Sequence, residues 1–114
     1  MPKGEHLGEF EQLAILSLLR CEAEGRPAYG MEVVREIEGV AERSATIGSV
    51  YGTLERLEEK GLLSSWHGEP DPERGGRPPR YFRVEPEGRR ALAETRAMTE
   101  RMWDGVRLDP EILG

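Results

Sequence analysis

Cysteine is nearly absent from this sequence, because Cys21 is the only one among 114 residues. A single cysteine excludes an internal disulfide and fits a reducing compartment, so we expect a cytoplasmic protein. The only histidines, His6 and His67, lie far apart in the chain. Together with Cys21 they make a poor zinc site, so we expect no metal and no cofactor.

Long apolar runs are missing as well. The longest, 13–19, is interrupted by Ser17 and stops at Arg20, well short of the ~20 residues of a membrane span. Residues 1–6 lack the apolar core of a secretory signal. With 33% charged residues and a mean hydropathy of −0.61, the composition predicts one soluble domain that does not enter a membrane.

Sequence motifs of common enzyme classes are also absent. The chain contains no HExxH, GxSxG, P-loop or GxGxxG pattern. Its many carboxylates fall mainly where solvated helix faces are expected. We therefore predict no catalytic residues and no enzymatic activity.

The chain has no overall excess of basic residues, since its net charge is −6. An acidic protein repels phosphate at long range, which counts against nucleic-acid binding. Salt screens charges beyond ~8 Å, however, so a local basic surface can still bind DNA. The interpretation therefore depends on where the charges lie.

The pattern of apolar residues predicts helices with one pair of strands. Gly61 closes the third helix, which either Ser44 or Thr46 can cap, and Pro86 suits the first turn of the last. The predicted order is helix 7–20, helix 29–38, helix 44–60, strand 62–67, loop 68–79, strand 80–84 and helix 86–104. This order predicts a mainly α fold with a small β-hairpin, a winged helix-turn-helix plus a C-terminal dimerisation helix. We expect residues 1–84 to form the DNA-binding domain and residues 85–114 the dimerisation helix.

In a winged helix the third helix enters the major groove. Its expected apolar stripe contains Ile47, Val50, Leu54 and Leu57, with Tyr51 at the edge. The opposite arc contains no acid and consists of Ser49, Gly52, Thr53, Arg56 and Lys60. Such residues suit close approach to bases and phosphates, although an ordinary amphipathic helix can carry the same pattern by chance.

The loop and the second strand hold the arginines Arg74, Arg77, Arg80 and Arg83. Flexible arginines at a hairpin tip suit a narrow minor groove or phosphates. Acids precede them at Glu69, Asp71 and Glu73, and the alternative is a solvated loop with internal ion pairs.

The last helix has apolar residues at spacings of three and four. It can pack on its own domain or pair with a second copy, and we favour the homodimer. Met98, Met102 and Trp103 are expected at the dimer centre, either as plain core or as a small-molecule pocket. We assign Phe10 and Ala14 to the same dimer or effector pocket.

Taken together, the motifs resemble those of the PadR family of transcriptional regulators, in its short subgroup with a single C-terminal helix. The matching segments are 7–13 (LGEFEQL), 28–30 (AYG), 48–62 (GSVYGTLERLEEKGL), 68–70 with 73–82 (GEP, ERGGRPPRYF) and 86–88 (PEG). They occur in the family's order and span nearly the whole chain.

The resemblance implies a homodimeric repressor that releases double-stranded operator DNA when a small aromatic or drug-like effector binds. It implies phosphate contacts at Tyr29 and Gly30. Recognition-helix contacts are implied at Thr46, Ser49, Tyr51 and Thr53, and wing contacts at Arg74, Arg77 and Arg80. Trp103 resembles a tryptophan that some short members place in a central pore. Gly52 departs from the family pattern, where a bulkier residue or proline is common.

A different function is compatible with the same fold. Some winged helices bind protein rather than DNA, and the overall acidity favours that alternative.

Overall fold

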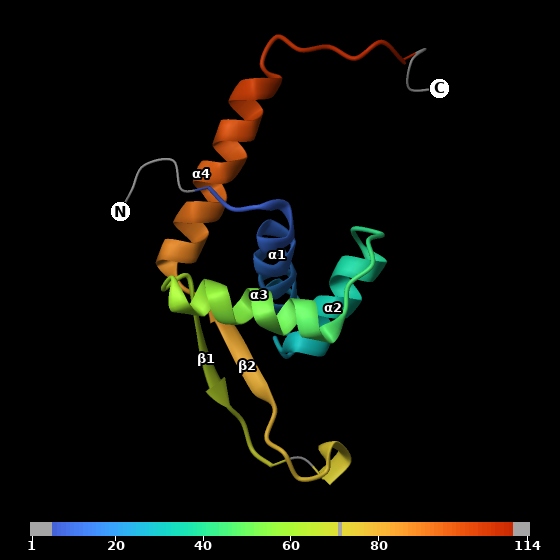
Figure 1. Ribbon diagram of the computed structural model, residues 1–114, viewed down its shortest axis with the longest axis vertical. Helices are drawn as coiled ribbons and strands as arrows, with labels where there is room; N and C mark the ends of the chain where they lie inside the picture. Colours follow the sequence, from blue (N-terminus) through green and yellow to red (C-terminus); the bar gives the residue numbers. More distant parts are fainter. Residues whose placement is uncertain (1–5, 71, 111–114) are drawn as a thin grey trace.

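The computed structural model describes residues 6–70 and 72–110, which form four α-helices and one two-stranded sheet (Figure 1). The order is α1 (Glu9–Ala23), α2 (Gly30–Gly39), α3 (Ile47–Glu59), β1 (Leu63–His67), β2 (Arg80–Val84) and α4 (Pro86–Trp103). A one-turn 3-10 helix, η1 (Pro72–Arg74), interrupts the loop between the strands. The predicted mainly α winged helix-turn-helix with a small hairpin is confirmed.

Local signals explain most element boundaries. Thr46, rather than Ser44, caps α3, and its hydroxyl accepts a hydrogen bond from the Ser49 amide at 3.1 Å. Gly61 ends this helix with a φ of +79°, a conformation that favours glycine. Pro86 lies in the first turn of α4, where its missing N–H costs nothing. The predicted bounds of the first helix, 7–20, differ from those observed, because α1 starts at Glu9 and continues past Arg20 to Ala23.

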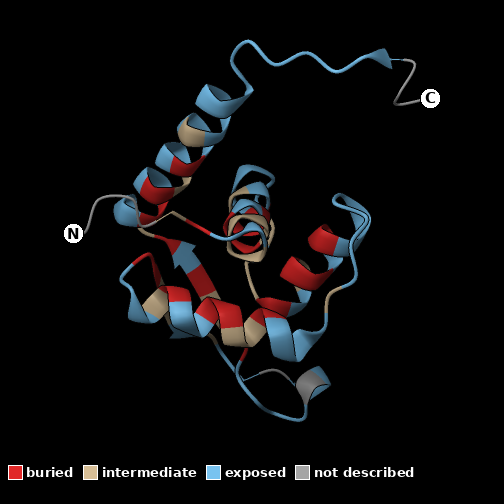
Figure 2. Ribbon diagram, turned by 45° about the horizontal axis from the view of Figure 1, so that its top comes forward, coloured by how far each residue is buried: buried red, intermediate tan, exposed pale blue. Residues whose placement is uncertain are grey.

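The core lies where α1, α2, α3 and the hairpin meet, as the buried faces in Figure 2 show. Two predicted core residues are exposed instead, Met31 by 38% and Ile47 by 40%. At about 100° per residue, Met31 is turned more than 90° from the centre of the buried face of α2. Ile47 is the first residue of α3, and a helical side chain covers the turn before its own Cα. No such turn precedes Ile47, so its side chain projects into solvent.

The hairpin pairs Leu63 with Val84 and His67 with Arg80 in antiparallel register. One face, with Leu63, Phe82 and Val84, is buried against the helices. The chain then turns tightly into α4. A Cβ at Gly88 would lie 2.3 Å from the Leu62 carbonyl oxygen, so only glycine allows this close packing.

Helix α4 packs on the domain only along its first half. Its buried residues are Gly88, Ala91 and Thr95, and Thr95 Oγ1 accepts a hydrogen bond from the Leu7 amide at 3.0 Å. The second half extends away from the domain (Figure 1). Within residues 6–70 and 72–110, no helix combines the length and the apolar character needed to cross a bilayer.

Candidate DNA-binding surface

The first turn of α3 presents hydroxyl groups to solvent. Thr46 and Ser49 are both exposed, and their hydroxyl oxygens lie 3.0 Å apart in a mutual cap. No acid occurs in this turn. Amide groups at a helix start have no partner inside the helix and attract anions. This end of α3 is therefore suited to a phosphate or a base edge.

The predicted exposed arc of α3 is only partly correct. Arg56 is exposed and Gly52 half-buried, but Thr53 is only 3% exposed. The Thr53 hydroxyl accepts a hydrogen bond from Arg56 Nη2 at 3.0 Å. Thr53 is therefore largely shielded from solvent, although it borders the same groove as Phe10 of α1 and Arg56.

A groove runs along the exposed side of α3, and Arg43 from the preceding turn lines it with Ser49, Gly52 and Arg56. The Arg43 guanidinium lies 5.2 Å from the centre of the Phe10 ring and forms an ion pair with Glu9. The sequence analysis overlooked Arg43. It could have been recognised in the sequence as a basic residue three positions before the Thr46 cap, in the turn between two predicted helices.

Tyr29 and Gly30 begin α2, with Tyr29 at the N-cap position. Gly30 is buried, and a Cβ there would lie 2.5 Å from the ring of Tyr51. The Tyr51 ring also lies 6.2 Å from that of Phe82. The half-buried ring of Tyr51 thus joins α3 to α2 and β2, and its contact with DNA stays a prediction.

Lys60 lies at the far end of α3 from Thr46. Its ammonium group forms an ion pair with Glu11 at 3.2 Å. Burial alone would raise the pKa of the Glu11 carboxyl, but hydrogen bonds from the Gly8 amide and Lys60 outweigh it and lower that pKa. The structure therefore engages Lys60 within the domain and does not place it beside Thr46 and Ser49.

The hairpin separates its arginines into different environments. Arg77 is exposed in the loop and has no ion-pair partner among the described residues. Arg80 forms an ion pair with Glu58 of α3 at 2.6 Å, donates a hydrogen bond to Ser65 and lies 4.9 Å from the Phe82 ring centre. The alternative of internal ion pairs is thus correct for Arg80, which faces α3 because it shares a hairpin face with Phe82. Arg74 lies on η1, and its side chain is outside the described part of the structure.

Both helix α3 and the hairpin loop lie on the side of the domain away from the C-terminal end of α4, with the loop extending beyond α3 (Figures 1 and 2). The exposed residues Thr46, Ser49 and Arg56 belong to α3, whereas Arg77 belongs to the loop. In the general docking geometry of winged helices, the third helix and the hairpin loop contact the same duplex.

The residues assigned to a dimer or effector pocket do not form one group. Ala14 is 0% exposed, because the other elements of the domain surround α1, and Phe10 lines the groove beside α3. The assignment of Ala14 is therefore wrong, whereas that of Phe10 stays a prediction. On α4, Met98 is half-buried, Met102 is 75% exposed and Trp103 is 53% exposed. The overlooked apolar residue is Leu16 of α1, 42% exposed, which borders a groove between α1 and α4.

Residues 15–94, more than half of the chain, match the model of the transcriptional regulator PadR-like family. The chain belongs to this family. No curated protein sequence matches it significantly. As a PadR-like protein it is a transcriptional regulator and not an enzyme, and its fold supports regulation through DNA binding.

Solved structures of transcriptional regulators share its fold. A PadR family regulator from Eggerthella lenta DSM 2243 is 29% identical, with a TM-score of 0.61 over 82% of this chain and 80% of that chain. A regulator from Clostridium thermocellum is 20% identical, with a TM-score of 0.66 over 82% and 85%. Bordetella bronchiseptica BpsR, whose DNA binding is regulated by 6-hydroxynicotinic acid, is 18% identical, with a TM-score of 0.57 over 94% and 72%.

Proposed function

We propose that this PadR-like protein is a homodimeric repressor that binds double-stranded operator DNA and releases it when a small aromatic or drug-like effector binds. The observation that supports this proposal most is that the acid-free α3 start and the exposed Arg77 loop both lie away from the C-terminal end of α4. In this proposal Thr46, Ser49 and Arg56 enter the major groove with Arg43 beside them. Arg77 and Arg74 approach the backbone or minor groove, and the amide groups of Tyr29 and Gly30 approach phosphate.

The distribution of acids supports DNA binding despite the net charge of −6. Several carboxylates are neutralised inside the domain, as in the pairs Glu36–Arg26 and Glu58–Arg80. Glu22 of α1 likewise pairs with Arg89 of α4. Salt screens interactions between charges that are more than ~8 Å apart. Binding therefore depends mainly on the residues that lie close to the phosphates.

The unburied half of α4 supports the homodimer, with residues 85–114 as its dimerisation segment and residues 1–84 as the DNA-binding domain. Exposed apolar side chains continue along it and the following chain, at Met102, Trp103, Val106 and Leu108. Monomers rarely expose large apolar patches, and a twofold partner would cover these side chains with its own copies of them. Leu16 of α1 borders a separate groove against the first half of α4, beside Leu92.

The effector part of the proposal has two supports. BpsR shares the fold and responds to a small heteroaromatic acid. In addition, Met98, Met102 and Trp103 would line the centre of a dimer formed through α4, and such side chains adapt to flat apolar ligands.

The direct test is protection of DNA from cleavage, using fragments from around the protein's own gene. We expect two protected half-sites about one helical turn (~34 Å) apart, one for each protomer. Operator binding would be refuted if the protein protected none of these fragments and bound none of them at low salt.

A further inference from the structure

A polar cluster joins the hairpin to the recognition helix α3. Arg80, the first residue of β2, forms an ion pair with Glu58 of α3 at 2.6 Å and lies 3.9 Å from a carboxylate oxygen of Glu55. The Ser65 hydroxyl of β1 donates to the Glu58 carboxylate, 2.8 Å from one oxygen and 3.0 Å from the other. It also accepts a hydrogen bond from Arg80 Nε at 3.2 Å. One helix and both strands therefore meet at three half-buried side chains.

The cluster lies at the loop end of the sheet. Arg80 and His67 form the last pair of the antiparallel register, beyond the buried pair of Leu63 and Val84. Backbone contacts hold the edge of β2, where the Phe82 amide donates to the Ala28 carbonyl at 2.9 Å. Hydrogen bonds along one edge still permit rotation about that edge. The tilt of the hairpin toward α3 therefore depends on contacts made by its face, nearest the loop through Arg80.

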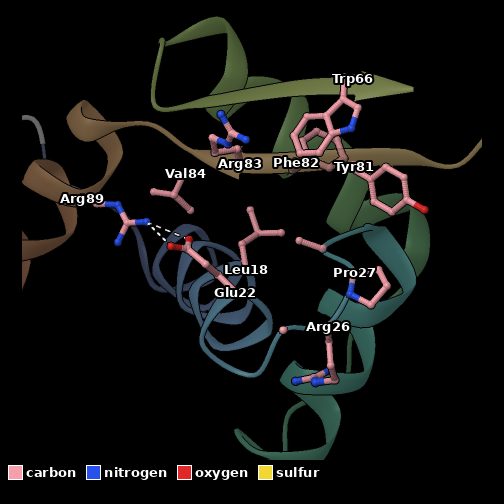
Figure 3. A pocket seen from close by; sticks show the side chains of 12 residues that line it. Leu18, Glu22, Arg26, Pro27, Trp66, Tyr81, Phe82, Arg83, Val84 and Arg89 are labelled. Carbon is pink, nitrogen blue, oxygen red and sulfur yellow. Dashed lines mark hydrogen bonds and ion pairs between the residues drawn. The ribbon is translucent and has the colours of Figure 1, made fainter. Parts of the chain in front are cut away.

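The opposite face of the hairpin has no such ion pair to a helix within the described part of the chain. Its side chains Trp66, Tyr81 and Arg83 line a cavity of about 650 Å³ (Figure 3). The Arg83 guanidinium lies 5.4 Å from the Trp66 ring centre, so it contacts its own hairpin, and no described carboxylate pairs with it. The charged contact that opposes a tilt away from α3 is thus the one made by Arg80.

The link between Arg80 and the exposed Arg77 is short and stiff. Pro78 and Pro79 separate the two arginines, and proline rings fix φ at about −65°. Pro79 is buried, and its carbonyl accepts a hydrogen bond from the Gly68 amide at 2.8 Å. A displacement of Arg80 is therefore passed on to the backbone of Arg77.

We propose that Glu58, Ser65 and Arg80 are positioning residues that set the angle between α3 and the Arg77 loop. They hold the loop ready for the duplex that α3 contacts, so less freedom is lost on binding. Without the cluster, α3 still enters the major groove, but the loop contributes less. Only this consequence for DNA binding rests on the proposed function.

The angle is measured without DNA, from residual dipolar couplings of backbone amides in the full chain. Glu58→Gln removes the clustered charge, and Glu59→Gln removes the exposed neighbouring charge, which has no ion pair to a described residue. In the wild type and Glu59→Gln, one alignment tensor should fit α3 together with residues 77, 80 and 81.

In Glu58→Gln, the couplings of residues 77, 80 and 81 should shrink or depart from the fit to α3. Lower stability alone does not produce this result, because the couplings report on folded molecules. A common tensor in Glu58→Gln, or the lack of one in the wild type, would overturn the proposal.

DNA affinity tests the consequence, because charge and position predict opposite results for Glu58→Gln. Removing a carboxylate and releasing Arg80 would raise affinity if charge alone mattered. Loss of the loop position should instead lower affinity and reduce by about one the slope of log affinity against log salt concentration, as in Arg77→Gln. Adding Arg77→Gln to Glu58→Gln should then change the slope no further. Higher affinity of Glu58→Gln, or a full additional effect of Arg77→Gln, would contradict the positioning role.

A second pair of variants leaves every charge in place. Ser65→Ala removes the hydroxyl shared by Glu58 and Arg80, and it should alter the couplings in the same direction as Glu58→Gln, by a smaller amount. Ser64→Ala is the matched control, because its hydroxyl donates to Glu85 at 2.7 Å, outside the cluster. Urea unfolding checks that all variants fold. Identical couplings in Ser65→Ala and Ser64→Ala would overturn the role of Ser65.

The two measurements separate failure of this inference from failure of the proposed function. Absence of DNA binding by the wild type would refute the proposed function, whereas the couplings would still decide what holds the loop. Normal DNA binding with a common tensor in Glu58→Gln would refute the positioning role alone.

Discussion

The ring of Tyr51 lies so close to Gly30 that a methyl group at position 30 would stand 2.5 Å from it. This contact joins the recognition helix α3 to the start of α2. It gives a structural reason for glycine in the Ala28-Tyr29-Gly30 segment, which sequence reasoning had assigned only to phosphate binding.

Gly30→Ala should therefore lower the free energy of unfolding by about 1–3 kcal/mol, the usual cost of overpacking a filled interior. Gly48→Ala is the matched control, because nothing lies within 4 Å of a Cβ there. The control should be as stable as the wild type or gain up to ~1 kcal/mol from helix propensity. Urea unfolding measures both, and equal stability of the two variants would show that the close contact does not constrain position 30.

Arg80 and Glu58 should be coupled in stability, since their 2.6 Å ion pair is partly shielded from water. A double-mutant cycle with Arg80→Gln and Glu58→Gln should give a coupling energy of about 0.5–1 kcal/mol. Arg77→Gln paired with Glu58→Gln should give none. Additive effects of Arg80→Gln and Glu58→Gln would argue that the hairpin is not held to α3 by this pair.

Glu36 should make stability depend on acid pH. Burial alone would raise the pKa of its carboxyl, but hydrogen bonds from Arg26 and Arg20 outweigh it and hold that pKa below the ordinary 4.5. Because the pKa of Glu36 is lower in the folded than in the unfolded protein, its ionised carboxylate stabilises the fold at pH values above the unfolded-state pKa. This stabilisation is lost as the pH falls through the folded-state pKa.

The stability difference between wild type and Glu36→Gln should thus be largest near neutral pH and shrink below a pH of about 4.5. Urea midpoints across this pH range measure it. Glu38→Gln, an exposed change on the same helix with no ion pair to a described residue, should show no such trend. A Glu36→Gln difference that stays constant to pH 3 or about that value would contradict the assigned ion pairs.

Placing charges on the unburied half of α4 should separate the protomers. Met98→Glu combined with Met102→Glu puts two carboxylates on the proposed dimer surface, where burying them unpaired is costly. Light scattering should then report the monomer mass. Ala97→Glu, exposed and turned about 200° from the buried Thr95, is the control and should leave the dimer intact. A double variant that remains dimeric would place the interface elsewhere.

Local signals made the fold predictable from sequence. Thr46, Gly61 and Pro86 mark helix ends through interactions within a few residues, so the positions of α3 and α4 followed from them. The alternation of apolar residues in 80–84 likewise identified β2.

The candidate site was harder to predict, because tertiary packing decides which side of an element faces solvent. Thr53 and Tyr51 lie on flanks of α3 that α1 and α2 cover, and helical periodicity does not show where those helices cross. Strand alternation places Arg80 opposite Arg83 but does not reveal which face meets α3. Ala14 was misassigned because an apolar helix face looks the same whether its own domain or a partner covers it.

The most direct measurement is DNA affinity between about 50 and 200 mM salt for the wild type, Arg77→Gln and Ser49→Glu. We predict that wild-type affinity falls by orders of magnitude across this range. Arg77→Gln should reduce by about one the slope of log affinity against log salt concentration. Ser49→Glu should bind no DNA while keeping its stability. Flat salt dependence of the wild type, or wild-type affinity in Ser49→Glu, would contradict DNA binding through α3 and the hairpin loop.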